Sequence, residues 1–352
     1  MRYRLLGRSG LRVSEIALGT MTFGETWGWG ASRDEARRIF ETYADAGGNF
    51  VDTACNYTDG ESEGFVGEFV RSDRDHFVLA TKYTLTLRRG DPNAGGNQRK
   101  NLVRTLDESL RRLGTDYVDV LWLHMWDGMT PVEEVVRAFD DLVSAGKVLY
   151  VGFSDTPAWV VAQAVALADL RGWARPVAVQ FPYSLADRDG ERELLPMAQG
   201  LDLAATTWGI LEGGALTGKY LAHGDEPRRY DSAGERVNDI AREVIAVAEE
   251  LDATPAQVAT AWVRQQPWPI VPIVGARSEA QMRENLAALD LELTDEQAER
   301  LSAASAFRPG FPREFLESDH VRGLIFGDTF DLIDDHRRPR SVRPEAALGA
   351  PS

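Results

Sequence analysis

The sequence has little of several features that mark particular classes of protein. It contains one cysteine, Cys55, among 352 residues, so no intramolecular disulfide can form. Such cysteine usage is typical of a reducing compartment, and we expect a cytoplasmic protein. No apolar stretch reaches the roughly 18 residues that a membrane span needs. The N-terminus MRYRLLGRSG lacks the apolar core of a signal peptide, so we expect neither secretion nor membrane insertion.

Basic residues and metal-binding patterns are also scarce. The chain has 39 lysines and arginines against 55 aspartates and glutamates, which gives a formal charge of -16. This balance disfavours general nucleic-acid binding because a phosphate backbone would be repelled, although one basic pocket for a small anion remains possible. The five histidines are scattered and form no short-spaced pair, so we expect no metal site.

What the sequence does contain is a regular alternation of short β-rich runs and longer amphipathic segments. The predicted strands are residues 15–20, 49–53, 77–82, 118–124, 148–154, 176–181, 201–208 and 268–275. The clearest predicted helices are residues 32–47, 98–114, 130–146, 156–172 and 278–290, the first with Ser32 as N-cap. Such alternation predicts parallel strands covered by helices. Eight units favour a closed (β/α)8 TIM barrel, with an open doubly wound sheet as the alternative because strand order is invisible here.

The domain organisation follows from this pattern. We expect one domain over residues 1–352, with the barrel from about 14 to 300. A short β-hairpin should precede it, because YRLLG and LRVSE flank the turn-like RSG. A C-terminal extension from about 305 to 352 should carry short helical pieces and lie over the barrel mouth. Its last residues, SVRPEAALGAPS, should be disordered.

Polar side chains stand at the ends of three successive predicted strands. Asp52, Lys82 and His124 each follow an apolar run, at the carboxyl end where barrel enzymes place their chemistry. Polar groups beside an apolar core are costly without partners, so three of them together indicate a site. Ser154 and Gln180 also end strands, and for them ordinary strand termination is an equally good interpretation.

Tyr57 lies five residues beyond Asp52, in a loop that can fold back over the same mouth. A phenol with a pKa of about 10 is a poor acid at neutral pH. A neighbouring ammonium such as Lys82 should lower that pKa, and the Asp52 carboxylate should keep the lysine charged and oriented. Together with His124, this set suits a carbonyl oxygen that gains negative charge during reduction. No side chain can supply hydride, so a cofactor must.

Over about residues 3 to 300 the chain resembles the aldo-keto reductases. The resemblance lies in GTMTFG (19–24), NFVDTACNY (49–57), ATK (80–82), VDVLWLH (118–124), GKVLYVGFSD (146–155), LTGKY (216–220) and VPIVGARSEAQMRENL (271–286). It implies a barrel that reversibly reduces an aldehyde or ketone with NADP(H). It also implies that Asp52, Tyr57, Lys82 and His124 form a catalytic tetrad. In that set Tyr57 is the general acid, Lys82 with Asp52 tunes it, and His124 orients the carbonyl.

The cofactor site must lie outside any Rossmann motif, because GWGASR (28–33) lacks the final glycine of such a fingerprint. Backbone amides and Ser278 at the start of a predicted helix form a good anion site, and Arg277 could pair with a ribose 2′-phosphate. The alternative is a solvated Arg277 and a simple helix cap at Ser278. The resemblance places nicotinamide on the Trp208 ring, with Ser154 and Gln180 on its carboxamide. The cofactor-binding set that it implies is Gly19, Thr20, Met21, Asp52, Ser154, Gln180, Trp208, Gly209, Leu211, Gly214, Leu216, Gly218, Lys219, Gly275, Arg277, Gln281, Glu284 and Asn285. Asp155 departs from the asparagine common in the family, and a carboxylate cannot donate a hydrogen bond as an amide can.

The substrate side is the least determined. We expect Phe23, Trp27, Tyr57, His124 and Trp126 to contact a small carbonyl or alcohol substrate. Their aromatic character favours an apolar or ring-shaped molecule, although tryptophans could simply cap the barrel. The Gly-rich insertion 83–100 should be mobile. The physiological substrate, the preferred direction and the oligomeric state do not follow from the sequence.

Two other functions are suggested by parts of the sequence. Ion-channel β subunits resemble the same family and keep its cofactor site, so a regulatory cofactor-binding subunit is the alternative to an enzyme. GGALTGKY (213–220) nearly matches a P-loop, but Tyr220 stands where serine or threonine would bind magnesium. An NTPase is therefore disfavoured.

Overall fold

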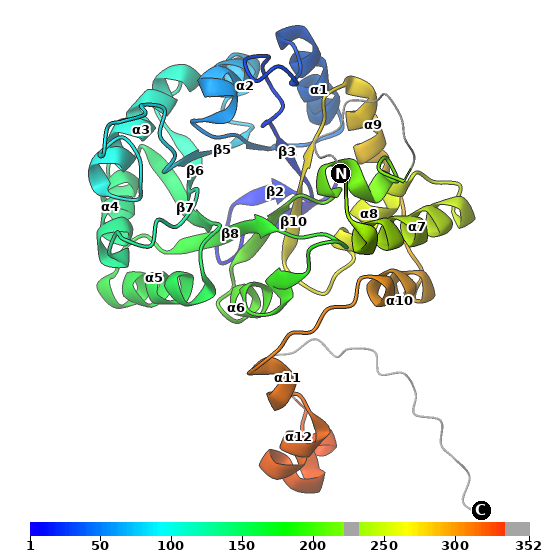
Figure 1. The fold of residues 1–352 in the computed structure, drawn as a ribbon. Coiled ribbons are helices and arrows are strands. Elements are labelled where there is room, and N and C mark those ends of the chain that lie inside the picture. Colours follow the sequence, from blue (N-terminus) through cyan, green and yellow to red (C-terminus); the bar gives the residue numbers. More distant parts are fainter. Residues whose placement is uncertain (222–231, 335–352) are drawn as a thin grey trace, which may run out of the picture. The chain divides into compact units, whose positions relative to one another are not determined.

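The strands form a closed parallel barrel. The computed structural model describes residues 1–221 and 232–334, and its eight barrel strands follow the order β10-β3-β4-β5-β6-β7-β8-β9. The helices form a ring around these strands (Figure 1). The predicted (β/α)8 barrel is confirmed, and the open sheet is excluded. The strands are β3 (Ala17–Gly19), β4 (Phe50–Asp52), β5 (Val78–Tyr83), β6 (Val118–Leu123), β7 (Val148–Ser154), β8 (Pro176–Pro182), β9 (Ala204–Trp208) and β10 (Ile270–Gly275).

Most helices of the outer ring are amphipathic and bury one face against the strands or a neighbouring helix. They are α1 (Arg33–Asp45), α2 (Glu61–Val70), α3 (Arg99–Leu113), α4 (Val132–Ser144), α5 (Ala158–Arg171), α6 (Leu194–Gly200), α7 (Glu235–Glu250), α8 (Pro255–Arg264), α9 (Glu279–Ala287) and α10 (Asp295–Ala304). The five helices expected from the sequence are α1, α3, α4, α5 and α9. Ser32 caps α1 as expected, its side chain accepting from the backbone of Glu35. No helix among the described residues is long and apolar enough to cross a membrane.

The inside of the barrel is a separate apolar core, distinct from the layer between strands and helices. Phe50, Val120 and Trp122 are fully buried in it, together with alanines and valines of other strands. Gly152 makes room for the indole, since a Cβ there would lie 2.3 Å from the Trp122 ring. The interior is therefore packed and contains no pore.

The expected N-terminal hairpin is present and closes one end of this core. Strands β1 (Tyr3–Leu5) and β2 (Arg12–Ser14) pair antiparallel. Leu6 and Val13 are fully buried in the same apolar cluster as the barrel interior. Gly7 makes the close approach possible, because a Cβ there would lie 2.1 Å from the backbone oxygen of Val177.

Residues 308–334 form a second compact unit with short helical pieces, as expected. They contain α11 (Arg313–Leu316), α12 (Asp319–Phe326) and the 3-10 segment η5 (Gly327–Leu332). The placement of this extension over the barrel mouth stays a prediction. The segment SVRPEAALGAPS, expected to be disordered, lies outside the described residues.

Candidate active site

The strand alternation carries three polar side chains to the carboxyl end of the barrel interior. Successive residues of a strand point to opposite faces, so positions two apart share a face. Asp52 stands two residues after the interior Phe50, and His124 stands two residues after Trp122. Lys82 of β5 pairs in register with Trp122, two residues beyond Ala80, which pairs with Asp52. The apolar interior thus ends in a polar layer, as the sequence predicted.

Lys82 is the centre of this layer. Its side chain is fully buried, and its ammonium forms an ion pair with the Asp52 carboxylate. The same nitrogen donates to the backbone oxygen of Thr53 at 2.9 Å and to the Tyr57 hydroxyl at 3.1 Å. Burial lowers the pKa of Lys82, but Asp52 and Tyr57 outweigh it and the pKa is raised overall. The ammonium therefore stays charged and directed at the phenol.

Asp52 is held from several sides. Gln180 donates from Nε2 to its Oδ1 at 3.1 Å. The Thr20 hydroxyl and backbone amide both donate to the Asp52 backbone oxygen, each at 3.0 Å. Ser62 in turn donates to the backbone oxygen of Thr20 at 2.8 Å. This network fixes the carboxylate and, through it, the lysine.

Tyr57 begins the 3-10 segment η1 (Tyr57–Gly60), which includes the left-handed residues Thr58 and Asp59. Thr58 ties the loop down, because its hydroxyl donates to the backbone oxygen of Phe23 at 2.6 Å. Burial raises the pKa of Tyr57, and the charge of Lys82 only partly offsets this. The sequence-based expectation of a lowered pKa is therefore wrong in its net direction. The phenol stays protonated at neutral pH, as a proton donor must.

His124 lies beside the phenol. Its ring packs edge-on against Tyr57, with centroids 6.0 Å apart and planes at 80°. Burial, aided by the charge of Lys82, lowers the pKa of His124 to about 3. Its Nδ1 is buried and has no hydrogen-bond partner among the described residues. A neutral imidazole with an unused polar atom is suited to hydrogen-bond a substrate oxygen.

Sequence reasoning missed a buried network that positions His124. The His124 backbone amide donates to the Thr84 hydroxyl at 3.2 Å, and Asn97 Nδ2 donates to the same hydroxyl at 3.0 Å. Asn97 also donates to the Met125 backbone oxygen at 2.9 Å and exchanges two 2.8 Å bonds with Asp127. Thr84 has φ of 101°, a strained value for a β-branched residue. The end of the 83–100 insertion is thus tied to the segment that carries His124.

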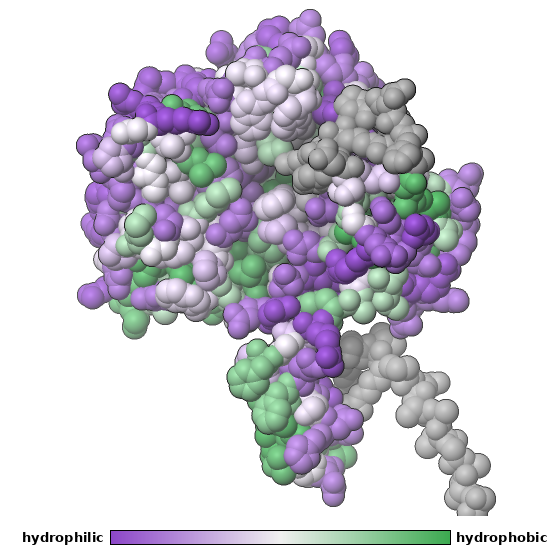
Figure 2. Space-filling view, in the orientation of Figure 1, coloured by the Kyte–Doolittle hydropathy of each residue, from purple (hydrophilic) through white to green (hydrophobic). Residues whose placement is uncertain are grey.

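The predicted substrate residues separate into two groups. Trp27 packs on Trp29 with ring centroids 5.8 Å apart, in a loop held by Glu61, which accepts from the Glu25 amide at 2.9 Å. Trp126 is half-buried next to the His124 segment. Figure 2 shows a hollow at the centre of the helix ring, where neutral and hydrophobic residues replace the hydrophilic rim.

Phe23 belongs to the second group. It is fully buried and packs edge-on against Phe69 of α2. Its ring therefore belongs to the outer core, which does not bear out the expectation that it contacts substrate. Phe23 and Trp27 lie in the same loop, and the sequence pattern of that loop does not show which aromatic ring is buried in the core.

On the expected cofactor side, the start of α9 has the form predicted for an anion site. Ser278 caps the helix and accepts from the Gln281 amide at 3.3 Å. The side chain of Gln281 accepts from the Arg277 amide at 2.8 Å, and Asn285 donates to the Gly275 backbone oxygen at 3.1 Å. Gln281 and Asn285 thus stabilise the loop itself, a role that the sequence did not suggest.

The ends of β7 to β9 supply further groups that fit a dinucleotide. The hydroxyl of Ser154 is buried and unpartnered among the described residues. Trp208 is 39% exposed, so one face of its ring is open for stacking. Left-handed glycines follow it at Gly209, Gly213, Gly214 and Gly218, in and around the 3-10 segment η4 (Glu212–Thr217). Backbone without side chains can approach a pyrophosphate closely, so these residues fit the group.

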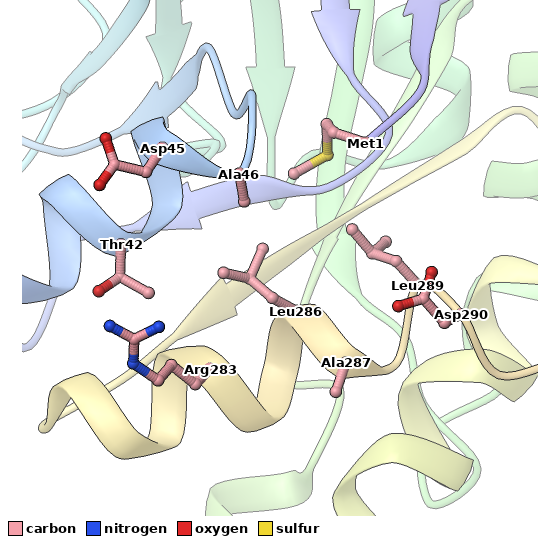
Figure 3. A pocket seen from close by; sticks show the side chains of 9 residues that line it. All are labelled: Met1, Thr42, Asp45, Ala46, Arg283, Leu286, Ala287, Leu289 and Asp290. Carbon is pink, nitrogen blue, oxygen red and sulfur yellow. The ribbon is translucent and has the colours of Figure 1, made fainter.

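A pocket of about 480 Å³ lies elsewhere on the barrel, between α1 and α9 (Figure 3). It is lined by Met1, Thr42, Asp45, Ala46, Arg283, Leu286, Ala287, Leu289 and Asp290. These residues come mainly from the carboxyl halves of the two helices, which lie at the opposite end of a βα unit from the strand ends. The pocket is therefore not part of the tetrad site. Among residues 1–221 and 232–334 no cluster of three or more His, Cys, Asp or Glu could hold a metal ion.

Comparison with known proteins identifies the family. Residues 15–306 match the model of the aldo/keto reductase family. Norsolorinic acid reductase of Aspergillus flavus is 37% identical over 328 residues, covering 89% of this chain and 84% of that protein. Aryl-alcohol dehydrogenase [NADP(+)] of Phanerodontia chrysosporium is 35% identical over 357 residues, covering 93% and 89%. Norsolorinic acid reductase B of Dothistroma septosporum is 36% identical over 374 residues, covering 98% and 94%. The chain belongs to the aldo-keto reductase family and is an NAD(P)H-dependent oxidoreductase.

Proposed function

We propose that this aldo-keto reductase reversibly reduces an aldehyde or ketone to an alcohol, with NADPH as hydride source and Tyr57 as proton donor. The observation that carries the proposal is the buried ammonium of Lys82, 3.1 Å from the Tyr57 hydroxyl and paired with Asp52. No observation favours the regulatory alternative over catalysis.

The four side chains divide the work. When bound, NADPH supplies the hydride. Tyr57 gives its proton to the carbonyl oxygen, and Lys82 stabilises the phenolate left behind. Asp52 keeps Lys82 charged. His124, neutral because of its lowered pKa, donates a hydrogen bond to the same oxygen and orients the carbonyl.

The cofactor contacts follow the features that fit a dinucleotide. Arg277, beside the capped start of α9, would pair with the 2′-phosphate and favour NADPH over NADH. Ser154 would use its unpartnered hydroxyl on the carboxamide, and Trp208 would stack on the ring. One of the relatives carries NADP(+) in its name, which supports this choice. The remaining proposed contacts are Gly19, Thr20, Met21, Asp52, Gln180, Gly209, Leu211, Gly214, Leu216, Gly218, Lys219, Gly275, Gln281, Glu284 and Asn285.

The substrate class we propose is an aromatic aldehyde or the corresponding alcohol. Trp126 lies two residues after His124, and Trp27 lies in a loop that is tied to α2 through Glu61. Their rings would line the substrate site, with Tyr57 and His124 as its inner wall. The name of the Phanerodontia chrysosporium relative, an aryl-alcohol dehydrogenase, agrees with such a substrate. We leave Phe23 out of this set because its ring is buried.

The variant Tyr57→Phe tests the proton donor. With NADPH and an aromatic aldehyde, we expect kcat to fall by about 10²- to 10⁴-fold, the usual contribution of general acid catalysis. The dissociation constant for NADPH and the melting temperature should hardly change, because only a hydroxyl is removed.

The matched control is Tyr117→Phe, which removes a phenol that donates to Asp75 at 3.0 Å on the protein surface. This control should keep the kcat of the unaltered protein. Full turnover in Tyr57→Phe would rule out the proposed proton donor.

A further inference from the structure

Asp155 follows directly on β7 and is rigidly placed at the barrel mouth. Its backbone amide donates to the Gln180 oxygen at 2.9 Å, and its backbone oxygen accepts from Trp126 at 3.3 Å. Its φ of 41° lies in the left-handed region, which aspartate tolerates better than most residues. The residue is thus held on both sides by neighbouring strand ends.

The Asp155 carboxylate, which is half-buried, lacks the cationic partner that three buried carboxylates of this protein have. Glu15 contacts Arg264 at 2.9 Å, Asp119 contacts Arg74 at 2.8 Å, and Glu63 contacts Arg112 at 2.6 Å.

Asp155 forms no ion pair among the described residues. Its side chain accepts a hydrogen bond from Trp208, whose Nε1 donates to Oδ1 at 3.3 Å. Lys82, whose positive charge acts on the pKa of Asp155, is already paired with Asp52. Within residues 1–221 and 232–334, the Asp155 charge is therefore not compensated by an ion pair.

Burial and the titratable groups around Asp155 determine its charge. Burial raises the pKa of Asp155 to about 6, with the Trp208 hydrogen bond and the charge of Lys82 acting in the opposite direction. The other titratable groups that face the mouth are Tyr57, protonated at neutral pH, and His124, neutral at neutral pH. Above about pH 6 the carboxylate is ionised, and no ion pair from the described part of the chain neutralises it.

We propose that the Asp155 carboxylate is the counter-charge for an oxidised nicotinamide ring, so that this protein binds NADP⁺ in preference to NADPH. The inference rests on the proposed function, which stacks nicotinamide on the Trp208 ring. The Trp208 indole nitrogen donates to Asp155, so the carboxylate lies at the edge of the indole ring on which the nicotinamide would stack. The oxidised nicotinamide carries a positive charge and the reduced one carries none, so an anion there favours only the oxidised form. An asparagine would keep the hydrogen bond without this selection.

Binding measurements of both cofactor forms test the proposal. For the unaltered protein, the ratio of the NADPH to the NADP⁺ dissociation constant should rise by roughly fivefold to tenfold between about pH 5 and pH 8, as Asp155 ionises. In Asp155→Asn, which preserves the acceptor for Trp208, the ratio should stay at its low-pH value throughout. The control Asp45→Asn removes an exposed charge near the end of α1 and should retain the pH dependence of the unaltered protein.

Calorimetry gives a second readout that does not depend on turnover. A tenfold preference implies, by linkage, that NADP⁺ lowers the pKa of Asp155 by about one unit. At about pH 5.5, NADP⁺ binding should therefore release about half a proton more than NADPH binding. The 2′-phosphate also titrates near pH 6, but it is common to both forms and cancels in the difference. The excess should vanish in Asp155→Asn.

The outcomes separate this inference from the proposed function. A flat ratio and equal proton release in a protein that turns over aldehyde with NADPH would overturn the role of Asp155 alone. Failure to bind either cofactor form would overturn both. An unchanged pH dependence in Asp155→Asn would assign it to another group and overturn the inference.

Discussion

The two ends of the barrel interior are built from the same strands but obey different rules. At the closed end, Phe50 and Trp122 pack with the N-terminal hairpin in a dry apolar cluster. Two residues further along the same strands, Asp52 and His124 stand in a polar layer. The first region stabilises the folded state by excluding water from apolar side chains. The second destabilises it to some extent, because charged groups are buried there.

This contrast teaches how one scaffold separates stability from chemistry. The period of two along a strand lets a change of residue type occur within 7 Å or so of chain, since each residue advances about 3.3 Å. The apolar end fixes the strands, and the strands fix the polar side chains. Variants at the apolar end should therefore lower mainly stability, and variants at the polar end mainly activity.

Lys82→Met should lower both stability and activity, and its effect should be the largest. It leaves the Asp52 carboxylate buried without its cation, so we expect unfolding free energy to fall by about 3–5 kcal/mol and activity to be lost. Chemical denaturation and steady-state kinetics measure the two effects. The double variant Asp52→Asn/Lys82→Met should recover much of the stability but none of the activity, because the buried charge is gone. A stable single variant would mean that the ion pair is not coupled to the fold.

Phe50→Ala should act mainly on stability. Removing a fully buried ring from the closed end should cost about 3–5 kcal/mol, because the surrounding strands cannot collapse into the cavity. Activity per folded molecule should stay within about twofold, as the strand retains its register with β5. The control Leu5→Ala, at a residue that is 60% exposed, should change stability by less than about 0.5 kcal/mol. A kcat that drops together with stability would show that the two ends are not independent.

The same contrast explains what the sequence could predict. Asp52, Lys82 and His124 were predictable because strand periodicity and barrel topology determine which way they point. The net pKa of Tyr57 was not, because the sequence shows the nearby Lys82 charge but not the burial that outweighs it. Phe23 was misassigned because the path of its loop decides between core and pocket.

Helices α2, α6, α7, α8 and α10 were not named in advance, though the alternation required helical segments at most of these places. Glycines at 64 and 67 weaken the apolar period of α2, and α6 is only seven residues long. The Thr84–Asn97 network was also missed, since contacts between loops depend on coordinates that no local pattern encodes.

Asn97→Ala tests whether the buried loop network positions His124. It removes one of the two donors to the Thr84 hydroxyl and the side-chain donor to the Met125 oxygen, at a cost of about 1–3 kcal/mol. Because the His124 backbone would shift, kcat should fall by about tenfold while the dissociation constant for NADPH stays unchanged. The control is Asn93→Ala, an exposed residue of the same insertion, which should change neither quantity. Unchanged kcat in the destabilised Asn97 variant would show that His124 does not depend on this network.

Asp155→Asn should change the free energy of unfolding least, and it should raise this free energy where the other variants lower it. The folded-state pKa of about 6 lies above the ordinary value of about 3.9, so the folded protein binds this proton more tightly than the unfolded chain. Stability is therefore lost as pH rises from about 4 through about 6, and the loss is complete above that range. Without cofactor, Asp155→Asn should be more stable than the unaltered protein by about 1–2 kcal/mol at pH 8, allowing for partial exposure, with a smaller gain at about pH 4.5. Asp155→Glu, which keeps a carboxylate, should show little of this gain in denaturant titrations. Equal stabilities of Asp155→Asn and the unaltered protein at both pH values would mean that the charge at the mouth costs the fold nothing, and that the polar layer is less strained than its unpaired carboxylate implies.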